Sequence, residues 1–235
     1  ISRRFQSIFK QKGIKVHTSS SIEDKAIKKE EYEKILVAVG RIPSTSDIGL
    51  EEVGVKTDEK GFIRVDAKMR TSAENIYAAG DCLPGPMLAH SAYAEGEIAA
   101  EAAAGGKPKA LDYDSVPNAT YTDVQVASVG LTEEEAKEKN LAYKAGKQLF
   151  KANAKAIINS ETEGFIKIIA EGKSHKILGV HIIGSHATEL IHEFALAKRV
   201  GLKVEDIAKT VHAHPTFSET VVDAAKAVFG KPIHG

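Results

Sequence analysis

The pattern of apolar and polar positions divides the 235-residue chain into two regions of different texture. In the first region, apolar residues recur at helical spacing over 1–9 and stop before Gly13, which predicts a helix followed by a strand over 14–17. The continuous apolar run 35–39 predicts a strand that is buried on both faces.

Three more elements are predicted before residue 107. The half-apolar segments 54–57 and 62–65 flank an Asp-Glu-Lys-Gly turn, which indicates a hairpin. The segment 75–81 predicts a short buried strand that ends in Gly-Asp. The Ala- and Glu-rich segment 90–104 predicts a helix that two glycines terminate.

Beyond Pro108 the pattern becomes one of strands followed by helices, which is typical of an α+β unit. A capping box at Thr132 and Glu135 predicts a short helix among the strands. The predicted strands are 121–129, 143–151, 164–170 and 176–183, and the predicted helices are 186–200, 204–209 and 216–228.

Composition narrows the classes of function. The chain has 32 Lys and Arg against 32 Asp and Glu, so its net charge is zero. A nucleic-acid partner is therefore not favoured, because such binding requires an excess of basic residues. The apolar runs are far shorter than the roughly 18 residues of a membrane span, and no signal-peptide pattern opens the chain. The single cysteine, Cys82, forms no intrachain disulfide and no His/Cys spacing predicts a metal site. We therefore expect a cytoplasmic protein without a bound metal, nucleic acid or membrane.

The segment 75–90 is a candidate nucleotide site. Asp81 follows an apolar strand at the edge where open α/β sheets hold nucleotides, and its carboxylate accepts hydrogen bonds from sugar-type hydroxyls. The turn that begins at Gly85 leads into a helix start, whose backbone N–H groups favour an electron-rich ligand edge. Gly-Asp after a strand is also ordinary turn chemistry.

A second turn, Val39-Gly40-Arg41, permits the same chemistry because Gly40 allows close backbone approach. By itself this turn favours the simpler interpretation of a strand exit beside a solvated Arg41.

The segment 212–219 is the richest in chemistry. Pro215 restricts the backbone beside His214, and Glu219 lies one helical turn further on, close enough to accept the Nδ1 proton of that ring. Such a pair makes a general base, because the carboxylate stabilises the imidazolium. Thr216 and Glu219 also fit a capping box, which would leave His214 as a surface residue, and spacing alone does not decide between the two.

Three blocks, 38–43, 75–90 and 212–219, resemble the pyridine nucleotide-disulfide oxidoreductases in the same order, and the resemblance covers essentially the whole chain. His-Ala-His-Pro-Thr-x-Ser-Glu is most similar to the branch of the family that oxidises dihydrolipoamide and reduces NAD⁺ through a disulfide and FAD. Relatives that act on glutathione usually change the residues around His-Pro-Thr.

The resemblance implies a role for each candidate residue. Asp81 would bind the ribityl hydroxyls of FAD, and Gly40 would contact NAD. His214 would be the catalytic acid/base and Glu219 its orienting partner. The residues lying along the flavin would be Met87, Leu88, Ala89 and His90.

The resemblance also implies an organisation. Residues 1–41 resemble the tail of an NAD domain, 42–106 the returning segment of an FAD domain, and 107–235 an interface domain. The fold class is therefore α+β, a remnant of nucleotide-binding α/β domains followed by an antiparallel sheet with helices. The partners implied are a second copy, whose active site His214 completes, and a 2-oxo acid dehydrogenase or glycine-cleavage complex.

The family's FAD and NAD glycine motifs and its CxxxxC disulfide belong before Ile1 and are absent. We therefore expect a carboxyl-terminal part of an enzyme, inactive and without cofactor when isolated. Val124 and the segment 153–156 depart from the family pattern, and we expect neither to touch the chemistry. Two alternatives remain, a non-catalytic dimerising fragment and a reductase of glutathione or coenzyme A disulfide.

Overall fold

A computed structural model describes residues 1–21 and 32–234 of the chain. The chain divides into two compact units. The larger unit joins Ile1–Val16 to the segment from Asp112 onward, and the smaller one is His17–Leu111.

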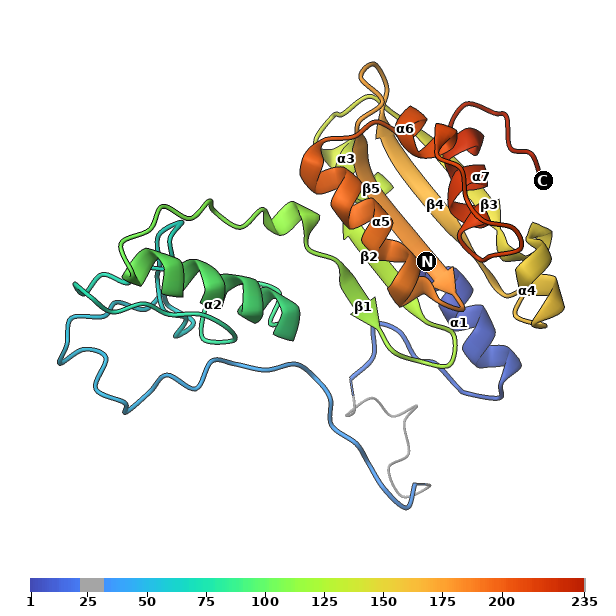
Figure 1. Cartoon of the computed structure of the whole chain (residues 1–235). Coiled ribbons are helices and arrows are strands. Elements are labelled where there is room, and N and C mark those ends of the chain that lie inside the picture. Colours follow the sequence, from blue (N-terminus) through green and yellow to red (C-terminus); the bar gives the residue numbers. More distant parts are fainter. Residues whose placement is uncertain (22–31, 235) are drawn as a thin grey trace. The chain divides into compact units, whose positions relative to one another are not determined.

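The larger unit is built on a five-stranded sheet in which every neighbouring pair is antiparallel, with the order β1-β2-β5-β4-β3 (Figure 1). The expected α+β class with an antiparallel sheet is therefore confirmed. Of the strand expected over 121–129, only residues 126–129 lie in a strand, whereas residues 121–125 form a turn after the preceding strand, in which the Thr122 hydroxyl donates to the Val124 carbonyl. The strands are β1 (Asn118–Thr120), β2 (Val126–Gly130), β3 (Tyr143–Leu149), β4 (Gly164–Glu171) and β5 (Ile177–Gly184).

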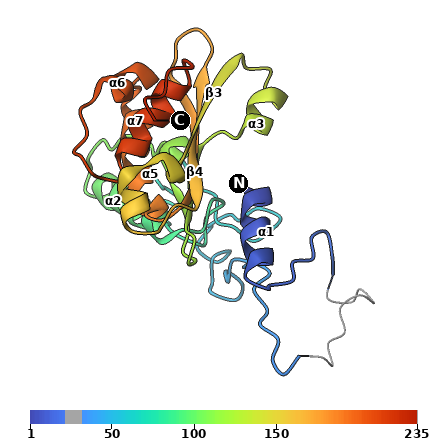
Figure 2. The same ribbon diagram turned by 90° about the vertical axis from the view of Figure 1, so that its right-hand side faces the viewer.

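Three helices cover one face of this sheet, as Figure 2 shows with the sheet seen nearly edge-on. They are α5 (Ala187–Val200), α6 (Val204–Lys209) and α7 (Glu219–Ala227), close to the predicted ranges. Ile166, Ile168 and Ile182 point to this face and form the main core with the helices. A Cβ atom on Gly146 would lie 2.4 Å from the Val228 nitrogen, so α7 ends directly against β3 and its position is fixed.

The opposite face of the sheet packs against α1 (Ser2–Gln11), the helix predicted at the start of the chain. Ile8 inserts there beside Phe165 and Ile183, which alternate in direction with the main-core residues of the same strands. Gly13 follows with a φ of +78°, a conformation suited to the residue after a helix end.

Short helices close the gaps between strands. The capping box predicted for α3 (Glu133–Glu138) is present, with the Thr132 and Glu135 side chains each bonded to the other's backbone N–H. The sequence pattern did not predict α4 (Ala154–Ile158), which Asn153 caps by accepting from the Ala156 N–H at 2.9 Å. Two 3₁₀ turns, η2 (Tyr113–Ser115) and η3 (Phe150–Ala152), complete the unit. None of the helices described in either unit is long and apolar enough to cross a bilayer.

The smaller unit contains α2 (Ala89–Ala103), as predicted, packed by Ile98 and Ala99 on a core of Val55, Ile63, Met69 and Leu83. The hairpin expected over 54–65 is reduced to a bridge between Thr57 and Ile63, and the strand expected over 75–81 to a bridge between Arg70 and Tyr77.

The predictions of strands over 14–17 and 35–39 are wrong. Leu36 and Val39 are each 91% exposed, and Ile14 is 49% exposed. An apolar strand is stabilised only when neighbouring strands accept its hydrogen bonds and other layers cover its faces. The described residues around these two segments form no ladder with them, so these apolar segments do not form strands.

His181 is a buried histidine in the middle of β5. Its Nε2 lies 3.0 Å from the Leu131 carbonyl oxygen and donates to it. Burial lowers the pKa of His181, the Leu131 carbonyl opposes that effect, and the charge of Lys167 adds to it. The folded state therefore favours the neutral ring.

We predict that this histidine makes folding pH-dependent. Below the unfolded histidine pKa of about 6.5, His181 binds a proton in the unfolded chain but stays neutral in the folded chain until its lowered pKa is reached. Stability should therefore fall as pH falls from about 7 towards the lowered folded pKa. His181→Gln retains an amide donor for Leu131 and should lack this component. Urea unfolding of both proteins between pH 5 and 8 measures it, and parallel pH profiles would contradict it.

Candidate functional site

His214 lies in the loop between α6 and α7, and its peptide bond to Pro215 is cis. The ring is 70% exposed, and its Nδ1 lies 2.9 Å from Oε1 of Glu219. No other hydrogen bond engages the ring within the described residues. The structure therefore brings together the two residues expected to form the acid/base pair, and it leaves Nε2 open to solvent.

Glu219 uses its two oxygens for different partners. Oε1 faces His214, and Oε2 accepts the Thr216 backbone N–H at 2.9 Å. The Thr216 hydroxyl donates to the Ala213 carbonyl rather than to the helix start, so only half of the alternative capping box forms. The two interpretations left open by the spacing are thus both partly correct, since Glu219 supports the backbone and the imidazole together.

Electrostatics keep Glu219 ionised. Partial burial opposes its charged form, but the hydrogen bonds from Thr216 and His214 outweigh burial and lower the pKa of Glu219. A carboxylate beside Nδ1 stabilises a positive charge on the ring and fixes Nδ1 as the donor. The free Nε2 is then the ring atom that is open to a ligand.

The loop that carries His214 is anchored from α4. The buried amide of Asn153 donates to the Thr216 carbonyl at 2.9 Å while its oxygen caps α4. Asn153 therefore supports the loop through the Thr216 backbone, and it contacts neither the His214 nor the Glu219 side chain. Phe217 packs next in sequence between the rings of Phe150 and His186.

The smaller unit brings together the other two predicted blocks. Arg41 places Nη2 at 2.7 Å from Oδ2 of Asp81 and 3.0 Å from the Met87 carbonyl oxygen. The Arg41 side chain is 64% exposed, in agreement with the simpler interpretation, and its contacts also join the turn after 35–39 to the start of α2. Gly40 precedes it with a φ of +104°, which favours glycine.

The start of α2 has features of a ligand cradle. Leu88 is its N-cap, Ala89 and His90 form its first turn, and no side chain caps it. The Gly80 N–H donates to the buried carboxylate of Glu95 at 2.7 Å. The Ser91 hydroxyl is buried without a partner, beside a small hollow that Asp81 and Met87 also line. An uncapped helix start with an orphaned hydroxyl suits a polar, electron-rich ligand edge.

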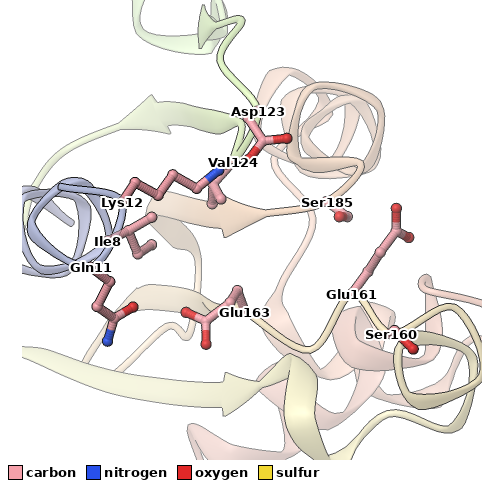
Figure 3. A pocket seen from close by; sticks show the side chains of 9 residues that line it. All are labelled: Ile8, Gln11, Lys12, Asp123, Val124, Ser160, Glu161, Glu163 and Ser185. Atoms are coloured by element: carbon pink, nitrogen blue, oxygen red, sulfur yellow. Dashed lines mark hydrogen bonds and ion pairs between the residues drawn. The ribbon is translucent and has the colours of Figure 1, made fainter. Parts of the chain in front are cut away.

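A cavity of about 350 Å³ lies in the larger unit, beside α1 (Figure 3). Its charged groups pair with one another or with neighbours, Lys12 with Asp123 and Glu163 with Arg4. None of the predicted site residues lines this cavity. Within the described ranges, no three His, Cys, Asp or Glu side chains gather to hold a metal ion.

Two family models match most of the chain. Residues 1–96 match the model "Pyridine nucleotide-disulphide oxidoreductase", and residues 116–225 match that family's dimerisation domain. The chain therefore belongs to the pyridine nucleotide-disulphide oxidoreductase family.

Similar proteins agree with this assignment. The dihydrolipoyl dehydrogenase of Geobacillus stearothermophilus is 42% identical over 96% of this chain and 47% of its own length. The mitochondrial dihydrolipoyl dehydrogenase of Pisum sativum is 48% identical over 87% of this chain and 40% of its own length. The chain thus spans less than half the length of these curated relatives.

Solved structures resemble the fold as well. LpdA from Mycobacterium tuberculosis superposes with a TM-score of 0.74 and 30% identity over 79% of this chain and 40% of that chain. The HOCl-induced flavoprotein disulfide reductase RclA from Escherichia coli has a TM-score of 0.74 and 26% identity over 80% of this chain and 44% of that chain.

Glu219→Gln should destabilise the larger unit by about 1–2 kcal/mol at pH 7, because it replaces a charged acceptor of two hydrogen bonds by a neutral one. A carboxylate with a lowered folded pKa contributes stability above its unfolded pKa of about 4.3 and loses it as pH falls. The difference from wild type should therefore shrink below about pH 4. Denaturant unfolding at pH 7 and pH 3.5 measures it, and an equal difference at both pH values would refute it.

Proposed function

We propose that this chain supplies the proton-transfer pair and the dimerisation region of a dihydrolipoyl dehydrogenase. Such an enzyme oxidises dihydrolipoamide and reduces NAD⁺. The observation that carries the proposal is the exposed imidazole of His214 held by the ionised Glu219. The names of relatives at 42–48% identity, dihydrolipoyl dehydrogenases, support the choice of dihydrolipoamide over other thiol substrates.

The chemistry of the dyad follows from its geometry. A substrate S–H bond breaks as its proton bonds to Nε2 of His214, and the electron pair stays on sulfur as a thiolate. Glu219 stabilises the imidazolium through the Nδ1 hydrogen bond. The thiolate is the form that attacks a disulfide, where a new S–S bond forms and the second sulfur leaves as a thiolate.

Cys82 does not provide that disulfide. It is the single cysteine of the 235 residues, and burial raises the pKa of its thiol, which disfavours the thiolate. The reacting disulfide therefore belongs to a polypeptide segment other than residues 1–235, and the dyad acts on a thiol that is brought to it.

FAD and NAD are the cofactors that we propose for the enzyme. FAD, when bound, carries electrons from the disulfide to NAD⁺. The orphaned Ser91 hydroxyl and the uncapped α2 start support a flavin edge along Met87, Leu88, Ala89 and His90. Asp81 would bind the ribityl hydroxyls while Arg41 holds its carboxylate in place, and Gly40 would contact NAD.

We propose a homodimer formed through residues 107–235, with His214 of one subunit serving the disulfide of the other. The match of residues 116–225 to a dimerisation domain supports the dimer. Residues 1–41 and 42–106 would then belong to the NAD and FAD domains. A 2-oxo acid dehydrogenase or glycine-cleavage complex would supply the lipoyl substrate.

In the holoenzyme, His214→Ala should lower kcat for dihydrolipoamide by about 10²–10⁴-fold, the usual contribution of a positioned general base. Glu219→Gln should lower it less, because the ring remains and loses only the charge beside Nδ1. Steady-state NADH formation measures both. His175→Ala is the matched control, since His175 also pairs with a glutamate, Glu205, and contacts neither His214 nor Glu219.

Wild-type turnover in His214→Ala would overturn the proposed role of the dyad. Faster oxidation of reduced glutathione or coenzyme A than of dihydrolipoamide would overturn the substrate. Those rates would instead support the related disulfide reductases as the enzyme class.

The purified 235-residue chain should be colourless near 450 nm and inactive by itself. The reason is that it contains no G-x-G-x-x-G segment to hold a pyrophosphate and no second cysteine. This outcome is also what a dimerising scaffold predicts, and the His214 variant in the holoenzyme separates the two. Flavin bound at one equivalent to the isolated chain would contradict the prediction.

A further inference from the structure

A second histidine of the same loop, His212, forms its own contact with a glutamate. Its Nε2 lies 3.2 Å from both carboxylate oxygens of Glu193 on α5, and its Nδ1 lies 3.1 Å from the Thr210 carbonyl oxygen. The His212 side chain is 9% exposed, whereas that of His214 is 70% exposed. No local spacing predicts this pair, because its partners are 19 residues apart on different elements.

His212 is not a second base. Both of its ring nitrogens face oxygen acceptors, so neither is open to a substrate, in contrast to Nε2 of His214. A buried ring with both edges engaged acts as a tether between the loop and α5.

The loop needs such a tether because apolar packing does not hold it near His214. Val211 is 96% exposed, and Ala213 and Pro215 are also exposed. The bond from the Thr216 hydroxyl to the Ala213 carbonyl is internal to the loop and attaches it to no other element. Over 211–215, His212 is the inward-pointing side chain.

The other attachments lie on either side of this stretch. The Thr210 hydroxyl donates to the Asp206 carbonyl of α6 at 2.8 Å, and Asn153 holds the Thr216 carbonyl. Without the contact to Glu193, the five residues between these attachments would be held mainly by the dyad itself. Segments with few buried contacts open at low free-energy cost.

We propose that Glu193 and His212 are a positioning pair, which holds the loop against α5 so that Nδ1 of His214 stays within reach of Glu219. The pair touches no reacting atom. Its importance for catalysis rests on the proposed function, but its effect on the geometry of His214 does not. The two can therefore fail separately.

Matched substitutions separate the two contacts of His212. In His212→Gln the amide nitrogen reaches the position of Nε2 and keeps a donor for Glu193. In His212→Asn the amide nitrogen takes the position of Nδ1 and keeps only the contact with Thr210. Glu193→Ala removes the acceptor from a helix surface, and Glu189→Ala, one turn earlier on α5, is its control.

The first measurement is NMR of the 235-residue chain with ¹⁵N-labelled histidine. The second is amide hydrogen exchange at Thr216, because the Thr216 N–H donates to Glu219 and its exchange rate reports whether that contact holds. Loss of a charged hydrogen bond should speed that exchange about tenfold in Glu193→Ala and His212→Asn. The His214 Nδ1 signal should move away from its hydrogen-bonded position in the same two variants. His212→Gln and Glu189→Ala should resemble wild type.

Unchanged His214 signals and exchange in Glu193→Ala would overturn the proposal, even if the His212 variants fold poorly. Equal effects of His212→Gln and His212→Asn would also overturn it, because the contact with Glu193 would then not be the one that matters. If instead the NMR result is as expected while His214→Ala keeps full turnover, the proposed function fails and the positioning pair stands.

Discussion

The candidate site depends on the fact that one carboxylate serves both the backbone and the imidazole. Glu219 accepts from the Thr216 N–H with one oxygen and faces His214 Nδ1 with the other. The backbone contact fixes the carboxylate at the first turn of α7, so the ring meets an acceptor that is already in place. Preorganisation of this kind is what makes a hydrogen bond useful to a reacting group, because no reorientation is needed when charge appears.

This arrangement requires that α7 itself be held firmly. At Gly146 the sheet has no side chain to separate β3 from the end of α7, so the helix packs at backbone distance. The helix also contributes Val221, Ala224 and Ala225 to the main core. A larger residue at position 146 would push α7 away from the sheet, and the carboxylate of Glu219 would move with it.

Local patterns predicted most of the larger unit. β3, β4 and β5 pair with neighbours in the same segment of chain, so their alternation reports the sheet directly. The strand prediction for 35–39 was wrong because its pairing partners are not local. Its apolar residues describe a strand between other strands, and the described residues supply no such neighbours, so sequence pattern and observed backbone disagree.

The contacts of the site were predictable only where they were local. His214 and Glu219 are five residues apart, and the fixed geometry of a helix start allowed their contact to be anticipated. The contact of Asn153 with Thr216 spans 63 residues and that of Arg41 with Met87 spans 46. No period or spacing encodes such pairs, because they arise from how the elements pack.

Among its described residues, the larger unit contains three histidine–glutamate pairs at hydrogen-bond distance, and their surroundings rather than their composition separate them. A fourth pair, His186 with Glu161, is looser at 3.8 Å and forms no hydrogen bond. In the His175–Glu205 pair, Nε2 of the ring faces the ammonium of Lys144 at 3.1 Å. In the His212–Glu193 pair, the second nitrogen, Nδ1, contacts the backbone carbonyl of Thr210. Of the three hydrogen-bonded pairs, His214–Glu219 is the one whose second nitrogen is left open within the described residues, on a ring that is largely exposed. A carboxylate partner orients the ring, and an open second nitrogen is what would allow proton exchange with a ligand. The hydrogen bond and the open nitrogen together make His214 the candidate, without reference to any relative.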